Sequence, residues 1–128
     1  METATISSSL ESLIKEVFAE ADKVESVSIF SRSGIVIVAE AKKLPCRPEL
    51  LGSMTSVAFA ALEDAMAGGE QRLLTIVATY NENVMIVQPL SPTMLQVAFL
   101  ASPDHVENAS AAMAKLRLRV GSEMSWLR

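Results

Sequence analysis

The chain has 128 residues, half of them hydrophobic, and a formal net charge of −4. This length fits a single domain, and the acidic balance argues against nucleic-acid binding, which needs a clustered basic face. The single cysteine, Cys46, excludes an internal disulfide framework and favours a reducing compartment. The beginning of the chain lacks the pattern of a signal peptide, and prolines and glutamines interrupt the uncharged run 83–103. We therefore expect a cytoplasmic protein without membrane insertion.

An amphipathic helix is predicted from about Ser9 to Asp22. Its apolar residues recur at intervals of three and four, and charged residues occupy the opposite side. Ser8 and Glu11 match a capping box, which places the beginning of the helix at this point. The residues before Ser8 are expected to lie outside the helix.

Two strands joined by a tight turn follow this helix. Residues 25–30 alternate with a period of two, and residues 31–34 form a turn in which Gly34 can take a positive φ. Residues 35–39 are a β-branched run without polar alternation, which predicts a strand buried on both faces. The connection is too short for a parallel crossover, so the two strands form an antiparallel hairpin.

A second helix is predicted between Pro48 and Gly69, because proline at the front and glycine at the back fit the signals for a beginning and an end. Apolar residues cover about half of its circumference. The opposite side carries small residues in place of charges, at Gly52, Ser53, Ser56 and Ala60. Two interpretations are open at this point. The helix is either a core helix whose small residues fit local geometry, or it is covered by its own sheet on the apolar arc and by a partner on the small-residue side.

The last predicted helix begins at Ser102, which serves as N-cap before Pro103, and ends at Gly121. The tail 121–128 contains the only tryptophan, Trp126, which either docks on the domain or a partner or stays loose. The chain is thus one domain with a core from about residue 8 to residue 120.

Three more strands are predicted between these helices, at residues 72–80, 84–87 and 94–100, with short turns that make an antiparallel meander. The predicted fold class is therefore α/β (α+β), with the order α-β-β-α-β-β-β-α around a five-stranded antiparallel sheet. The first and last helices share one face of the sheet, and the central helix has the other face to itself. Because one helix cannot cover five strands, the second interpretation is favoured, with a second copy against the small-residue side.

This pattern resembles the Roadblock/dynein light-chain family over nearly the whole chain, from Val27 to Val120. The segments that carry the likeness are VSIFSRSGIVIVAEA, LLGSMTSVAFAALEDAMAGGE, LLTIVATYNENVMIVQPL, MLQVAFLAS and the final helix. The family has no catalytic signature. One departure is the turn at Ser33-Gly34, where an Asp-Gly pair is more typical of the family.

The resemblance implies a homodimer, or a heterodimer with a paralogous Roadblock chain, in which the central helices lie side by side. It also implies that the strand 72–80 pairs with its counterpart, through Leu73, Thr75, Val77 and Thr79. The paired helices would then form a docking platform for a small Ras-like GTPase, which the module activates or senses. Glu63 and Asp64 would border that platform.

No catalytic, metal or cofactor site is predicted, and the chain is not expected to be an enzyme. The only histidine, His105, falls in the first turn of the last helix and is interpreted as a surface residue. Metal sites need several His, Cys or carboxylate ligands at suitable spacing, which the sequence does not supply. Cys46 beside a cation is a weak candidate for a reactive thiol. An arginine finger from Arg32, Arg47 or Arg72 is not required by this interpretation.

The alternative function is a small-molecule sensor of PAS, GAF or profilin-like type. Antiparallel sheets flanked by helices also form ligand pockets. Such a pocket needs convergent polar groups inside an apolar cavity, and the sequence does not indicate them.

Overall fold

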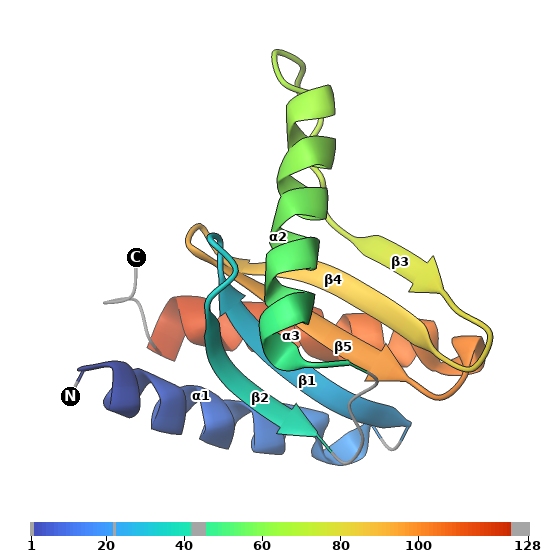
Figure 1. Ribbon diagram of the computed structural model, residues 1–128. Helices are drawn as coiled ribbons and strands as arrows, with labels where there is room; N and C mark the ends of the chain where they lie inside the picture. Colours follow the sequence, from blue (N-terminus) through green and yellow to red (C-terminus); the bar gives the residue numbers. More distant parts are fainter. Residues whose placement is uncertain (1, 22, 42–45, 124–128) are drawn as a thin grey trace.

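The computed structural model describes residues 2–21, 23–41 and 46–123, and for residues 2–7 and 20 it describes the backbone alone. The predicted order of helices and strands is confirmed, with a five-stranded antiparallel sheet (Figure 1). The elements are α1 (Glu2–Val17), a 3₁₀ turn (Phe18–Glu20), β1 (Val24–Ser31), β2 (Val36–Ala41), α2 (Pro48–Ala65), β3 (Ile76–Thr79), β4 (Val84–Ser91), β5 (Met94–Leu100), a second 3₁₀ turn (Pro103–His105) and α3 (Val106–Glu123).

The sheet has the strand order β2-β1-β5-β4-β3, and every neighbouring pair is antiparallel. The predicted hairpin β1-β2 and the meander β3-β4-β5 are both present. Gly34 closes the hairpin with a φ of 91°, and its N–H donates to the Ser31 carbonyl at 2.9 Å. A positive φ favours glycine at this turn, as the sequence predicts.

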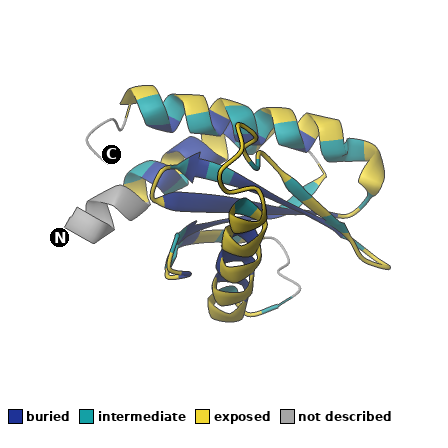
Figure 2. Cartoon of the chain, turned by 90° about the horizontal axis from the view of Figure 1, so that it is seen from above, coloured by how far each residue is buried: buried dark blue, intermediate teal, exposed yellow. Residues whose placement is uncertain are grey.

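One face of the sheet is covered by α1 and α3 together. Their apolar stripes form a single cluster with inward residues of the strands, such as Ile29, Ile86 and Leu100. Arg119 on α3 bonds Glu16 on α1 at 2.7 Å, which ties the two helices at their solvent side. The buried residues concentrate in the sheet and under this helix layer (Figure 2).

The other face carries α2 alone, over a second cluster that includes Phe30, Phe59, Val97 and Phe99. The helix crosses the strands and rises away from the sheet, so its C-terminal half projects past the sheet (Figure 1). Most of α2 is exposed (Figure 2). One helix therefore leaves part of this face uncovered, as the sequence argument expects.

Two helix ends differ from the predictions. The first helix begins at Glu2 and not at Ser9, so Ser8 lies inside it and is not its cap; serine is only mildly unfavourable within a helix. The last helix continues through Gly121 to Glu123. Buried Val120 and the bond from Arg119 Nε to Glu123 at 2.8 Å hold this final turn, and they override the glycine stop. Trp126, for which the sequence leaves a docked and a loose tail open, lies outside the described residues.

Three strands also differ. The run 35–39 is not buried on both faces, because β2 is an edge strand in which Val38 alone is fully buried. The third strand is shorter than predicted, since residues 66–75 first descend from the projecting end of α2. The fourth strand extends through Pro89 to Ser91. Proline is tolerated there because the ladder with β3 ends at Val87, which leaves the outer edge of β4 unpaired by a strand.

Candidate protein-interaction surface

The small residues of α2 mark the place where this helix crosses the β1-β2 hairpin. A Cβ added at Gly52 would lie 2.4 Å from the Gly34 carbonyl oxygen and 2.6 Å from Phe30 Cδ1. Such distances are well below van der Waals contact, so the helix backbone rests directly on the turn. One turn later, Ser56 is also buried, and its hydroxyl donates to the Ser53 carbonyl at 3.1 Å.

This crossing shows that the predicted assignment of the helix faces is wrong for two of the four small residues. Gly52 and Ser56 pack against the chain's own hairpin and sheet and are not free to face a partner. Ser53 and Ala60 are exposed, as a partner-facing role requires. Small residues are selected here by a close backbone crossing within the domain.

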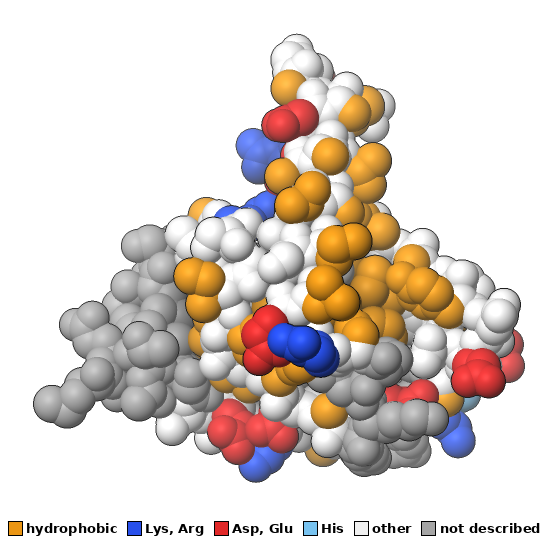
Figure 3. All heavy atoms as spheres, viewed as in Figure 1, with side chains coloured by type: hydrophobic (Ala, Val, Ile, Leu, Met, Phe, Trp, Pro, Cys, Tyr) orange, Lys and Arg blue, Asp and Glu red, His pale blue; other side chains and the backbone are white. Residues whose placement is uncertain are grey.

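Part of the predicted apolar arc of α2 is exposed, although the sequence argument placed the whole arc against the sheet. Leu51 and Phe59 of this arc are buried, but Leu50 and Met54 are 56% and 64% exposed. Val57, which lies outside the predicted arc, is 69% exposed. Leu62 and Met66 continue the buried row of Phe59, but they lie on the projecting half of α2, where they are again exposed. Figure 3 shows hydrophobic side chains along the whole length of this helix. The α2 apolar surface is our name for the exposed hydrophobic residues of this helix, which are Leu50, Met54, Val57, Leu62 and Met66.

The edge strand β3 continues this apolar region. No described strand pairs with its outer side, because β3 is the last strand of the sheet. Of the predicted interface residues, Val77 is 48% exposed, and Thr75 and Thr79 are exposed as well. Leu73 is half-buried against the α2-side core. The α2 apolar surface and the edge of β3 therefore form a region with exposed hydrophobic side chains and an open strand edge.

Comparison with known proteins adds to this geometry. No protein-family model matches the sequence, and no curated protein matches it either. Solved structures do match its fold. A Roadblock/LC7 domain from Streptomyces avermitilis has a TM-score of 0.70 at 13% identity, over 80% of this chain and 87% of that one. Myxococcus xanthus MglB has a TM-score of 0.67 at 14% identity, over 86% and 88%.

The chain has the Roadblock/LC7 fold. Schizosaccharomyces pombe profilin is also similar, with a TM-score of 0.62 at 15% identity over 84% of this chain and 92% of that one. At these identities the likeness concerns the fold.

One ion pair fixes α2 on this Roadblock/LC7 fold. Arg32, on the hairpin turn, donates from Nη1 to Glu63 Oε1 at 3.0 Å, and its guanidinium lies 5.1 Å from the centre of the Phe59 ring. The predicted docking residue Glu63 is thus already engaged within the domain, while Asp64 is exposed. An arginine finger from Arg32 would have to give up both contacts.

Cys46 and His105 are the remaining side chains considered for chemistry. Burial raises the pKa of the Cys46 thiol, which disfavours the reactive thiolate. His105 lies in the 3₁₀ turn before α3 and is half-buried. Within the residues that the structure describes, no group of three or more His, Cys, Asp or Glu side chains could hold a metal ion. None of the helices formed by the described residues has the length and apolarity of a membrane span.

Sequence reasoning missed part of the exposed apolar region. Val57, Leu74 and Tyr80 are large, exposed and apolar, yet the sequence pattern did not assign them to an interface. The available signal was the absence of charge between Glu49 and Glu63, which leaves no solvated face anywhere on the helix. Such a helix is covered on more than one side.

Proposed function

We propose that this chain is a cytoplasmic, dimeric protein-interaction module that binds and regulates a small Ras-like GTPase. The observation that carries the proposal is the α2 apolar surface beside the open edge of β3. Exposed apolar patches of this kind mark interaction sites, and open strand edges pair with other chains. The structural neighbours, which include MglB, fit a GTPase-regulating module.

The dimer we propose places two copies of α2 side by side and pairs β3 with β3 of the second copy. Leu62 and Met66 support this arrangement because they continue the core-facing row of Phe59 beyond the sheet, where a second copy would supply the missing cover. The strand contribution comes from Thr75, Val77 and Thr79, and the helix contribution moves from the small residues to the α2 apolar surface. A paralogous chain with the same features could replace the second copy.

The regulatory mechanism we propose is binding and not catalysis by this chain. A GTPase that docks on the paired helices would be held in one nucleotide state, because contact with its switch regions favours the conformation that fits. The engagement of Arg32 by Glu63 and Phe59 supports a mechanism that uses no arginine finger from this turn.

The first test is the oligomeric state. Sedimentation of the wild type over a wide concentration range is expected to give a dimer. Met54→Asp should raise the dimer Kd about tenfold or more, because it places a carboxylate in an apolar contact. Leu118→Asp is the matched control, since Leu118 is 70% exposed on α3 on the other face of the sheet. A monomer at all concentrations would refute the dimer.

The second test is nucleotide dependence. The protein is mixed with a Ras-like GTPase from the same organism, loaded with GDP or with a non-hydrolysable GTP analogue, and binding and GTP hydrolysis are measured. We expect preference for one nucleotide state, with loss of binding in Met54→Asp and retention in Leu118→Asp. Equal binding of both states, without any change in hydrolysis, would refute GTPase regulation while leaving the dimer intact.

A further inference from the structure

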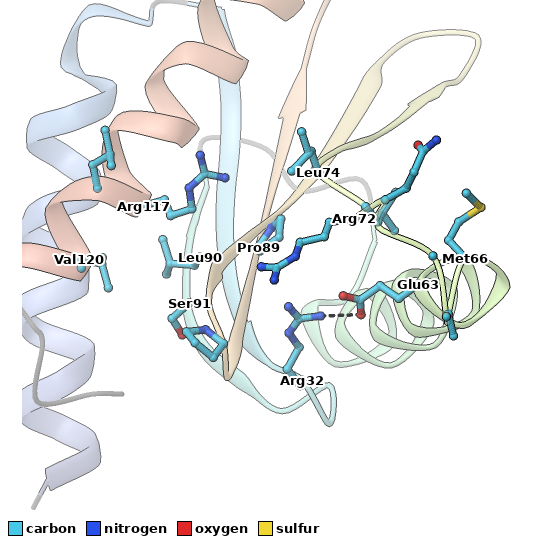
Figure 4. A pocket seen from close by; sticks show the side chains of 18 of the residues that line it. Arg32, Glu63, Met66, Arg72, Leu74, Pro89, Leu90, Ser91, Arg117 and Val120 are labelled. Carbon is cyan, nitrogen blue, oxygen red and sulfur yellow. Dashed lines mark hydrogen bonds and ion pairs between the residues drawn. The ribbon is translucent and has the colours of Figure 1, made fainter.

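A cleft of about 1040 Å³ opens at one end of the sheet, between the C-terminal end of α2 and the last turns of α3 (Figure 4). Its walls come from the end of α2, the segment 66–74, the turn after β4 and the last turns of α3. The cleft therefore joins elements from both faces of the sheet at the place where β3 no longer covers β4. Its volume is at the upper end of the range for ligand sites.

The cleft collects positive charge in an acidic protein. Arg32, Arg72 and Arg117 line it from three different elements, while Glu63 is the only acid among its described lining residues and is paired with Arg32. Neither Arg72 nor Arg117 forms an ion pair with a described residue. The whole chain has a net charge of −4, so two uncompensated guanidinium groups in one cleft reverse the local sign. Arginine forks suit bidentate bonds to carboxylates and phosphates.

The same cleft has an apolar lining. Leu74 and Leu118 are 66% and 70% exposed, and Leu90 is buried beneath the lining. Figure 4 shows Arg32 and Arg72 extending toward the same region near Glu63, whereas Arg117 belongs to the α3 side. The lining of the cleft thus includes both apolar and cationic side chains. A compact inorganic anion would leave the leucines uncovered.

No described strand pairs with the outer edge of β4 along this site. The ladder with β3 ends at Val87, but β4 continues to Ser91, and residues 89–91 line the cleft. Peptides commonly bind by lying along a free strand edge, with pockets beside the edge taking their side chains.

We propose that this cleft binds an extended acidic peptide segment of a partner protein. Its carboxylates bond Arg72 and Arg117, and apolar side chains between them cover Leu74 and Leu118. The cleft shares Met66 with the α2 apolar surface, but Arg72 and Arg117 lie outside that surface, and the proposal goes beyond the proposed dimer and its GTPase. An acidic peptide and this chain both carry a net negative charge and therefore repel each other overall. Binding of the peptide would thus depend on the local positive charge of the cleft.

The test is fluorescence anisotropy with a labelled hexapeptide Glu-Glu-Leu-Leu-Glu-Glu at low ionic strength, with Gln-Gln-Leu-Leu-Gln-Gln as the matched neutral probe. The wild type is expected to bind the acidic probe and not the neutral one. Arg72→Glu and Arg117→Glu should each weaken binding about tenfold or more, because each loses a charge-assisted bond. Arg47→Glu makes the same charge change at an exposed arginine outside the cleft and should bind as the wild type does.

Three results would overturn the proposal. The neutral probe could bind as tightly as the acidic one, or both cleft variants could match Arg47→Glu. Alternatively, calorimetry could detect binding of inorganic phosphate while the acidic peptide does not bind, which would make the cleft a small-anion site. Circular dichroism checks that each variant is folded. If Arg72→Glu or Arg117→Glu does not fold, Arg72→Gln or Arg117→Gln is used in its place. Sedimentation of the same variants distinguishes a defect in the cleft from a defect in dimerisation. A variant that loses peptide binding but sediments like the wild type is defective in the cleft alone.

Discussion

Replacing Gly52 by alanine tests the crossing of α2 over the hairpin most directly. In an ordinary helix this change stabilises by about 1 kcal/mol, because glycine is a poor helix former. At this position the new methyl group would lie 2.4 Å from the Gly34 carbonyl oxygen and 2.6 Å from the Phe30 ring. One of the two backbones must therefore move by about 1 Å to restore contact distance.

The turn cannot yield easily, so the substitution is expected to destabilise. Gly34 is held in its left-handed conformation by the bond of its N–H to Ser31 at 2.9 Å. Overpacking of a closed contact costs about 1–3 kcal/mol, and the backbone origin of the clash puts this case at the upper end. The gain in helix propensity offsets about 1 kcal/mol of this cost, so we expect the free energy of unfolding to fall by about 2 kcal/mol. For a domain of this size that loss lowers Tm by roughly 8 °C.

The assay is thermal and urea unfolding followed by circular dichroism, at two protein concentrations. Ser53→Ala is the control, since Ser53 is exposed on the same helix and its hydroxyl only donates to the Glu49 carbonyl at 3.1 Å. It should change stability by less than about 0.5 kcal/mol. If Gly52→Ala were as stable as Ser53→Ala, the close crossing would be refuted. If the loss of stability disappeared at high protein concentration, Gly52 would instead belong to an interface with a partner chain.

Two further substitutions test the ties between elements. Arg32→Ala should lower the free energy of unfolding by about 1 kcal/mol, since it removes a partly exposed pair with Glu63 and a contact with the Phe59 ring. The stability of Arg32→Lys should lie between those of the wild type and Arg32→Ala. An unchanged urea midpoint in Arg32→Ala would contradict this role of Arg32. Two bonds from Arg119 hold the pKa of Glu123 below its ordinary value, so this contribution to stability is present near neutral pH and lost as pH falls below about 4. Glu123→Gln should therefore lower Tm at pH 7 but not at pH 3, and an equal difference at both would contradict the linkage.

The order of elements could be predicted because its signals are local. Period-two alternation, the Gly34 turn and the Ser102 cap depend on neighbours in the sequence. In the structure the Ser102 hydroxyl accepts a bond from the Asp104 N–H at 3.2 Å, as its N-cap role requires. The pairing of α1 and α3 on one face also followed, since each carries one apolar stripe.

The faces of α2 could not be predicted in the same way. An apolar arc normally turns toward the core, but here the helix has no charged side for comparison. The reason for Gly52 lies at Gly34, in another element, and a sequence pattern along one helix does not contain that contact. The position of Leu62 is a similar case, because its exposure depends on where the sheet ends and not on its own neighbours.

The cleft was beyond sequence reasoning for a related reason. Arg32, Arg72 and Arg117 are separated along the chain and show no spacing motif. They meet because the hairpin turn, the segment before β3 and the end of α3 all reach the same end of the sheet. The continuation of α3 through Gly121 helps to build this wall, and the sequence predicted a stop there.

The size of the exposed surface on α2 limits how the proposed dimer can be built. Covering a large apolar side chain that is about half exposed contributes roughly 1 kcal/mol. Five such residues in each of two copies therefore supply about 10 kcal/mol. Association costs about 4–15 kcal/mol in lost freedom, so helix contacts alone leave a marginal complex. In the proposed dimer, the pairing of β3 edges would then decide the stability of the complex, because it would add backbone bonds and cover Val77 at the same time. We infer that the two parts of the surface act together, and that neither forms a stable dimer without the other.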